Sequence, residues 1–283
     1  MFRTVAFILG LLLGAGANAA EPTGALAAIN RSGVIKLGYL ASAPPFSFDQ
    51  GGAPAGYTVD VCTHVAEDIA HQLGRPSLRI EWFKLTQQDR LAAVREGRVH
   101  VECGTTTWTL SRQEQVDFSL MTFIDGGSVL VRGNSDLLRL NDLAGKRIAV
   151  VPGTTTEKNL RAALKQRALL ADVMLVSSPD KAIEMLSSGQ VDGYASDRVV
   201  LMGLGLSAQG AHTFRLLDED FSVEPYALIL PRDEHDLRLA VNRALARLYR
   251  SGEIQSIFER WLGALGAPSM LLSAMYYLQS VPE

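Results

Sequence analysis

Residues suited to binding an anion lie in the run GTTTWTLSR at 104–112, directly after an expected strand. Gly104 permits close approach of the backbone, and the hydroxyl and N–H groups of a bend can bind a carboxylate. Arg112 can add two parallel hydrogen bonds to the same group. The run therefore predicts a carboxylate-binding site, although a simpler interpretation has Thr109 or Ser111 capping a helix and Arg112 as a surface charge.

Two other expected strands are also followed by polar residues. The run PGTTTE at 152–157 is a second bend rich in hydroxyl groups at a helix N-terminus, and its Thr and Glu three residues apart also resemble a capping box. No Gly-Lys-Ser/Thr follows Gly153, so a phosphate-binding P-loop is not expected. Asp197 could cap the next helix or accept hydrogen bonds from an ammonium group. A cation, hydroxyl donors and a carboxylate together suit a zwitterion.

The sequence contains no constellation typical of an enzyme or a metal site. It lacks a GxSxG nucleophile motif and an HExxH motif, and its histidines show no paired-ligand spacing, at His64, His71, His100, His212 and His235. We therefore expect no catalysis, no metal and no cofactor. With 47% hydrophobic residues, 20% charged residues and a formal net charge of -3, the composition also argues against nucleic acid as a partner.

The elements that position these residues alternate between strands and helices in two successive runs. The helix at 62–73 carries one apolar stripe, as expected for a helix packed on a sheet. Strands are expected at 34–40, 78–85 and 98–103, then at 147–151, 173–178 and 191–196; further helices are expected at 87–96, 156–164 and 181–186. This order predicts an α/β fold with two lobes, each a helix-covered and mainly parallel sheet.

Two extended segments are expected to connect the lobes, because the chain must leave the first lobe and return to it. Segment 123–131 would lead out and 223–230 would lead back, forming a hinge of two strands. We expect lobe 1 at 30–125 and 227–283, lobe 2 at 126–226, and hinges near 124–131 and 221–227. Ligands of such sheets bind beyond the carboxyl ends of the strands, which places a site between the lobes.

The N-terminus has the pattern of a secretory signal peptide. Arg3 is followed by an apolar run at 5–13 and by small residues at 17–19, and the run is too short to span a membrane. We expect residues 1–19 to be removed and the mature protein to reside in the periplasm. Export would permit a disulfide between Cys62 and Cys103, but their apolar settings favour two unpaired core residues.

Several long motifs resemble one known family, the periplasmic solute-binding proteins for polar amino acids, and within it the glutamate/aspartate-binding branch. The resemblance covers nearly all of the mature chain. Its motifs are PPFSF at 44–48, GYTVDVCTHVA at 56–66, ECGTTTWTLSRQEQVDFS at 102–119, GTTTE at 153–157, Asp197 and EPYALIL at 224–230. It implies the type II periplasmic binding protein fold, an amino-acid ligand, a membrane permease of an ABC importer as partner, and a monomer without cofactor.

The resemblance also implies roles for individual residues. Arg112 would bind the ligand α-carboxylate and Asp197 the α-ammonium. Four hydroxyl-bearing residues would assist with the carboxylate, namely Thr105, Thr107, Thr154 and Thr155.

The side-chain pocket departs from the family pattern. Arg90 matches a side-chain arginine of the glutamate/aspartate binders, but Leu40 stands where they carry a second arginine. Gln87 replaces a serine and Pro179 replaces a histidine. Glutamate or aspartate is the first expectation for the ligand, with glutamine, asparagine or another polar amino acid as the alternative.

Two other functions remain open for this scaffold. An exported enzyme resembling cyclohexadienyl dehydratase would need an acid or base with a shifted pKa inside the cleft. A soluble amino-acid sensor would use the same ligand site. The tail at 266–283 contains no span of the kind that a fused receptor needs.

Overall fold

The computed structural model describes residues 21–207 and 214–282. The expected signal peptide at 1–19 and His212 lie outside the described residues. Within them, no helix combines the length and apolar character that crossing a membrane requires.

The first lobe is built on a parallel arrangement of three strands. The strand β1 (Val34–Leu40) pairs with both β5 (Arg79–Leu85) and β6 (Val101–Cys103). The predicted apolar stripe is the buried face of α2 (Tyr57–Gln72). The remaining elements of this region are α1 (Gly24–Ser32), α3 (Arg90–Arg95), α4 (Leu110–Gln113) and a small sheet of β2 (Ser42–Ala43), β3 (Ser47–Gln50) and β4 (Ala53–Ala55).

The second lobe repeats the alternation of strands and helices, as predicted. Its parallel strands are β8 (Arg147–Val150), β9 (Asp172–Leu175) and β10 (Gly193–Asp197). Its other elements are η1 (Leu140–Leu143), α5 (Thr155–Gln166), α6 (Pro179–Ser187), α7 (Arg198–Ser207) and β11 (Phe214–Leu216). The mixed α/β fold class is confirmed.

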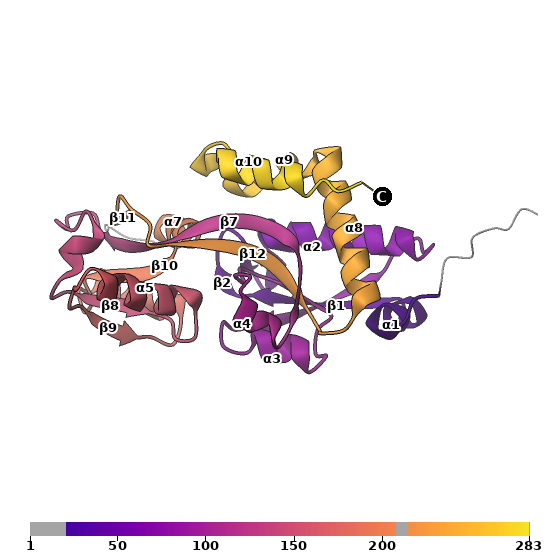
Figure 1. The fold of residues 1–283 in the computed structure, drawn as a ribbon, viewed down its shortest axis with the longest axis horizontal. Coiled ribbons are helices and arrows are strands. Elements are labelled where there is room, and N and C mark those ends of the chain that lie inside the picture. Colours follow the sequence, from indigo (N-terminus) through magenta and orange to yellow (C-terminus); the bar gives the residue numbers. More distant parts are fainter. Residues whose placement is uncertain (1–20, 208–213, 283) are drawn as a thin grey trace, which may run out of the picture.

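Two long antiparallel strands cross between the lobes (Figure 1). They are β7 (Asp117–Arg132) and β12 (Ser222–Leu230), and their register shifts near Tyr226 and Ala227. Because β6 pairs with β12 and β10 pairs with β7, the strands of both lobes join one sheet in the order β5-β1-β6-β12-β7-β10-β8-β9. The predicted crossing at 123–131 is therefore part of a longer strand.

The chain ends in helices that pack around the first lobe and the crossing strands. They are α8 (His235–Ser251), α9 (Glu253–Leu262), η2 (Gly263–Leu265) and α10 (Met270–Leu278). Helix α8 packs on α2, and α10 packs on β7. The Tyr276 hydroxyl lies 2.7 Å from the Tyr57 hydroxyl, joining α10 to α2.

The expectation of two unpaired cysteines is wrong. Cys62 and Cys103 form a disulfide that links α2 to the end of β6. Both residues are buried, as their apolar patterns indicated. Burial alone did not indicate that the two side chains face each other.

The helix expected at 87–96 begins later, at Arg90. The Asp89 carboxylate accepts hydrogen bonds from the Thr86 backbone N–H at 2.7 Å and from its hydroxyl at 2.9 Å. These bonds close a turn and leave Gln87 outside the helix, two residues after the end of β5. The shorter helix matters because it leaves Gln87 beside the cleft.

Candidate functional site

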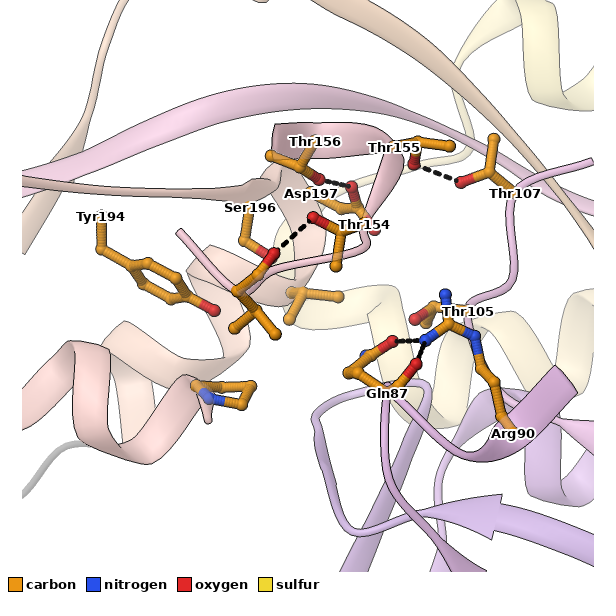
Figure 2. A pocket seen from close by; sticks show the side chains of 13 residues that line it. Gln87, Arg90, Thr105, Thr107, Thr154, Thr155, Thr156, Tyr194, Ser196 and Asp197 are labelled. Carbon is orange, nitrogen blue, oxygen red and sulfur yellow. Dashed lines mark hydrogen bonds between the residues drawn. The ribbon is translucent and has the colours of Figure 1, made fainter. Parts of the chain in front are cut away.

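Seven of the eight site residues proposed from the sequence line one cavity between the lobes (Figure 2). They are Gln87, Arg90, Thr105, Thr107, Thr154, Thr155 and Asp197. Each follows or ends a strand or begins a helix, as the rule for open α/β sheets predicts. The cavity volume of about 20 Å³ is close to what one water needs. An amino acid can therefore enter only if the walls move apart.

Direct contacts between the lobes hold these walls together. The Thr107 and Thr155 hydroxyls lie 3.1 Å apart, and the Ser42 hydroxyl donates to Asp180 at 2.9 Å. A Cβ at Gly203 would lie 2.4 Å from the Pro44 carbonyl oxygen, so glycine allows α7 to approach the first lobe closely. The structure is thus a closed arrangement of the cleft.

Arg112 is the site residue that the structure does not bring into the cavity lining. It is only 8% exposed, and its Nη1 donates to the Thr107 carbonyl at 2.8 Å. Burial and the nearby Arg90 lower the pKa of Arg112 to about 10. The capping alternative is confirmed for Thr109, whose hydroxyl accepts from the Arg112 N–H at 3.2 Å. Arg112 is therefore no surface charge, and it braces the bend that carries Thr107.

Thr154 is the N-cap of α5. Its hydroxyl accepts from the Glu157 N–H at 3.1 Å and donates to the Val151 carbonyl at 2.8 Å. The Glu157 carboxylate accepts in turn from the Gly153 N–H at 3.0 Å. The capping interpretation of this run thus holds, and the hydroxyl of Thr154 is already fully engaged. The neighbouring Thr155 turns its hydroxyl toward Thr107 instead (Figure 2).

Glu224 is a site residue that the sequence interpretation missed. It is fully buried at the cleft end of β12, and the Thr107 and Thr155 hydroxyls both donate to its Oε2 at 2.7 Å. Ser222 and Asn159 donate to its Oε1 at 2.6 and 3.0 Å. An acidic residue inside an otherwise apolar strand was the available signal.

Asp197 is buried and lies at the end of a short chain of hydrogen bonds. It accepts from the Thr156 hydroxyl at 3.1 Å and from the Tyr226 hydroxyl at 2.6 Å. Tyr226 also lies 3.3 Å from Asp125. Burial, then the Glu224 charge, raise the pKa of Asp197 to about 6, and burial with the Asp197 charge raises that of Asp125 well above its usual range. A cation bound here would stabilise the charged form of Asp197 and lower its pKa.

Arg90 lies buried on the first-lobe side of the cavity (Figure 2). Its Nη1 donates to both the carbonyl and the side-chain oxygen of Gln87, and its Nε donates to Thr106 at 2.9 Å. Thr106 donates to Glu102 at 2.9 Å. Burial raises the pKa of Glu102 to about 7, against the influence of Arg90 and Thr106. The guanidinium of Arg90 is thus hydrogen-bonded to residues of its own lobe.

Close packing explains the glycine after β6. A Cβ at Gly104 would lie 2.1 Å from the Glu102 carboxylate and 2.7 Å from Leu40. Glu102 and Leu40, rather than a ligand, occupy the space that this glycine leaves open. Across residues 21–207 and 214–282, no three His, Cys, Asp or Glu side chains are grouped to hold a metal ion.

The two lobes, the paired crossing strands and the polar cavity between them define a two-lobed binding protein of type II. The chain belongs to the bacterial extracellular solute-binding proteins, family 3, whose profile matches residues 35–264. The resemblance drawn from the sequence motifs is thereby confirmed.

Individual relatives agree with this assignment. The L-glutamate/L-aspartate-binding protein of Pseudomonas aeruginosa is 30% identical over 256 residues, covering 90% of this chain and 85% of that protein. The structure of an ancestral arginine-binding protein bound to glutamine matches 82% of this chain and 98% of that one, with a TM-score of 0.72 and 27% identity. An ancestral amino-acid-binding protein described as a precursor of cyclohexadienyl dehydratase shares the fold at a TM-score of 0.71 and 23% identity, with coverage of 83% and 98%.

Proposed function

We propose that this protein captures a polar α-amino acid in the periplasm and delivers it to the membrane permease of an ABC importer, acting as a monomer. The observation that carries the proposal is the pairing of Asp197 with a hydroxyl-rich cleft between two lobes. A buried carboxylate suits an α-ammonium, and bends rich in hydroxyl and N–H groups suit an α-carboxylate. Family membership and the names of the relatives support the same conclusion.

The proposed mechanism starts with separation of the lobes about β7 and β12, with the lobe boundaries expected from the sequence. The ligand ammonium then lies near Asp197 and Glu224, two carboxylates whose mutual repulsion it relieves. The carboxylate lies against the bends at 105–107 and 154–156, with Arg112 bracing the first bend at the Thr107 carbonyl. Closure buries the ligand, and the closed form is presented to the permease.

A panel of amino acids tests the proposal by thermal unfolding of the mature protein. A ligand at a hundred times its Kd stabilises the folded state by about 2.7 kcal/mol. For a chain of this length the melting temperature should rise by roughly 5–10 °C. No rise with any amino acid would overturn the proposal.

Replacing Arg112 with alanine is expected to weaken amino-acid binding at least about tenfold, because the bend loses its brace at the Thr107 carbonyl and the site loses a cation. Titration calorimetry measures the affinity, and urea unfolding separates binding loss from instability. Arg79→Ala removes an exposed arginine and is the matched control. Wild-type affinity in the Arg112 variant would contradict its role.

Binding is expected to weaken as the pH falls below about 6. Asp197 has a raised pKa, so its carboxylate is charged above pH 6 and gains a proton below it. The ammonium needs the charged form, and affinity should fall by up to about tenfold per pH unit. Calorimetry from pH 5 to 8 in buffers of different ionisation enthalpy should show proton release on binding near pH 6. Affinity that is flat across this range would argue against Asp197 as the ammonium partner.

An exported enzyme on this scaffold is the second candidate function. One observation favours it, since Asp197 lines the cavity with a pKa raised to about 6, as a general acid or base would require. Mass spectrometry of ligands after prolonged incubation separates the two functions. A binding protein returns its ligand unchanged, whereas a converted product would establish catalysis.

A further inference from the structure

A second cavity adjoins the first on the side of Gln87 and Pro179, two residues that line both. We call it the Leu40 chamber, after one of its walls. Its volume is about 100 Å³, larger than that of the first cavity. Leu40, Leu85 and Pro179 form apolar walls, and Ser42 and Ser177 add hydroxyl groups. Once the walls of the first cavity move apart to admit an amino acid, the chamber offers space for a side chain that extends beyond the α-carbon region.

Among the described residues, no ionisable side chain lines the Leu40 chamber. The charged side chains of this part of the chain that hydrogen-bond to the lining residues are two carboxylates and one arginine. Asp180 accepts from Ser42 at 2.9 Å, and Asp89 accepts from Thr86 at 2.9 Å. Asp89 is paired with Arg98 at 3.3 Å, so the exposed Asp180 is the carboxylate that would repel an anionic side chain placed in the chamber, and solvent weakens that repulsion.

Arg90 does not offset this repulsion, because it is absent from the chamber lining and its hydrogen bonds go to residues of its own lobe. It donates to Gln87 and Thr106, and buried Glu102 is the acidic group with the largest effect on its pKa. With its oxygen directed at Arg90, the Gln87 amide has its NH₂ group left as a donor. Gln87, which lines both cavities, therefore offers a neutral donor to the ligand side chain.

The Tyr194 hydroxyl provides an independent indication of a ligand. Tyr194 is 1% exposed and lines the first cavity, into which its hydroxyl points (Figure 2). Ser196 lies close enough to affect its pKa, yet the hydroxyl has no hydrogen bond of good geometry with any described residue. Buried hydroxyls are nearly always hydrogen-bonded. A polar atom of the ligand side chain would satisfy it.

We infer that the cargo is an α-amino acid with an extended, uncharged side chain, such as an amide or a thioether. The polar atom of this side chain would hydrogen-bond to Tyr194 and Gln87, and the rest of the side chain would lie in the Leu40 chamber. The inference rests on the proposed function and narrows the class of amino acid that the protein binds. An acidic side chain would be desolvated in the chamber, where no described cation lines the walls to balance it.

Calorimetric titration of the wild-type protein at pH 7.5 tests the inference with glutamine, methionine, glutamate, aspartate, arginine and alanine. Glutamine or methionine should bind at least tenfold more tightly than each of the other four. If a charged amino acid or alanine binds as tightly, the inference fails while the proposed function stands. If none of a full amino-acid panel binds, the proposed function fails as well.

A variant that fills the chamber supplies a second test. Ser177 is exposed and lines the chamber. The variant Ser177→Trp should therefore weaken the binding of glutamine or methionine, whichever binds more tightly, at least tenfold. The binding of alanine should weaken less than threefold. Leu175→Trp adds the same bulk two residues away, at a residue that is 56% exposed and outside the chamber. Equal losses for the long and the short ligand, or no loss for the long one, would overturn the assignment of the chamber to the side chain.

Discussion

Replacing Asp197 with asparagine is expected to weaken amino-acid binding about a hundredfold while leaving the fold intact. The amide keeps an oxygen that can accept from Thr156 or Tyr226, so the packing is nearly unchanged. It lacks the charge that would hold an ammonium. Charge-assisted hydrogen bonds contribute about 1.5–3 kcal/mol, and further ionic attraction inside a closed cleft adds to this. Calorimetry against the tightest ligand of the wild-type protein measures the loss.

The same substitution should stabilise the ligand-free protein at pH 7. The pKa of Asp197 is raised to about 6 in the folded state, so folding opposes its ionisation. Keeping Asp197 charged in the folded state therefore lowers the free energy of unfolding. This loss is absent at a pH where the group is protonated, and it reaches its full size above pH 6. Asparagine removes this loss because its side chain is neutral. A variant that binds less tightly but unfolds at a higher urea concentration would identify a residue kept for function at a cost in stability.

Asp172→Asn is the matched control, since Asp172 is exposed and lies at the start of β9. It should change neither affinity nor stability measurably. If Asp197→Asn binds like the wild-type protein, the ammonium assignment is wrong. If it unfolds more easily, Asp197 serves the structure instead.

The sequence predicted the fold well because its evidence is local. Apolar periodicity marks the buried face of each helix, and alternation of strands with helices restricts the topology to a parallel sheet. The stripe at 62–73 became the core face of α2, and each predicted strand of the two lobes exists with its ends shifted by a few residues. The start of α3 differed because a side-chain turn at Asp89 competes with the helix.

The site was predicted only in part, because the contact between Glu224 and Thr107 depends on pairing between distant segments of the chain. The bend after β6 meets β12 through the Thr107–Tyr226 bridge, and the Trp108 N–H donates to the Pro225 carbonyl at 2.7 Å. This pairing brings Glu224 to Thr107. Local pattern cannot reveal such a register, nor can it show that Arg112 donates to the Thr107 carbonyl of the bend.

The disulfide is expected to make the largest contribution to stability of any single link in the chain. Its cysteines are 41 residues apart in sequence, and closing a loop of that length restricts the unfolded chain by about 4 kcal/mol in the entropic account. The variant Cys62→Ala/Cys103→Ala should lose about 3–4 kcal/mol of unfolding free energy in urea. Its ligand affinity should change less than threefold below the melting temperature, since neither cysteine lines the cavity.

Reduction of the wild-type protein separates loss of the link from loss of side-chain volume. Both cysteines are fully buried, so dithiothreitol should act only as the protein opens, and the reduced protein should match the alanine variant to within about 1 kcal/mol. A much smaller loss on reduction would assign the effect in the variant to the cavities left by alanine. Two alkylatable thiols in the unreduced, unfolded protein would show that the bond does not form.

Because the bond joins α2 to the strand that leads into the Gly104 bend, its loss should loosen the first lobe before the second. Hydrogen exchange of β6 against β8 would reveal that order.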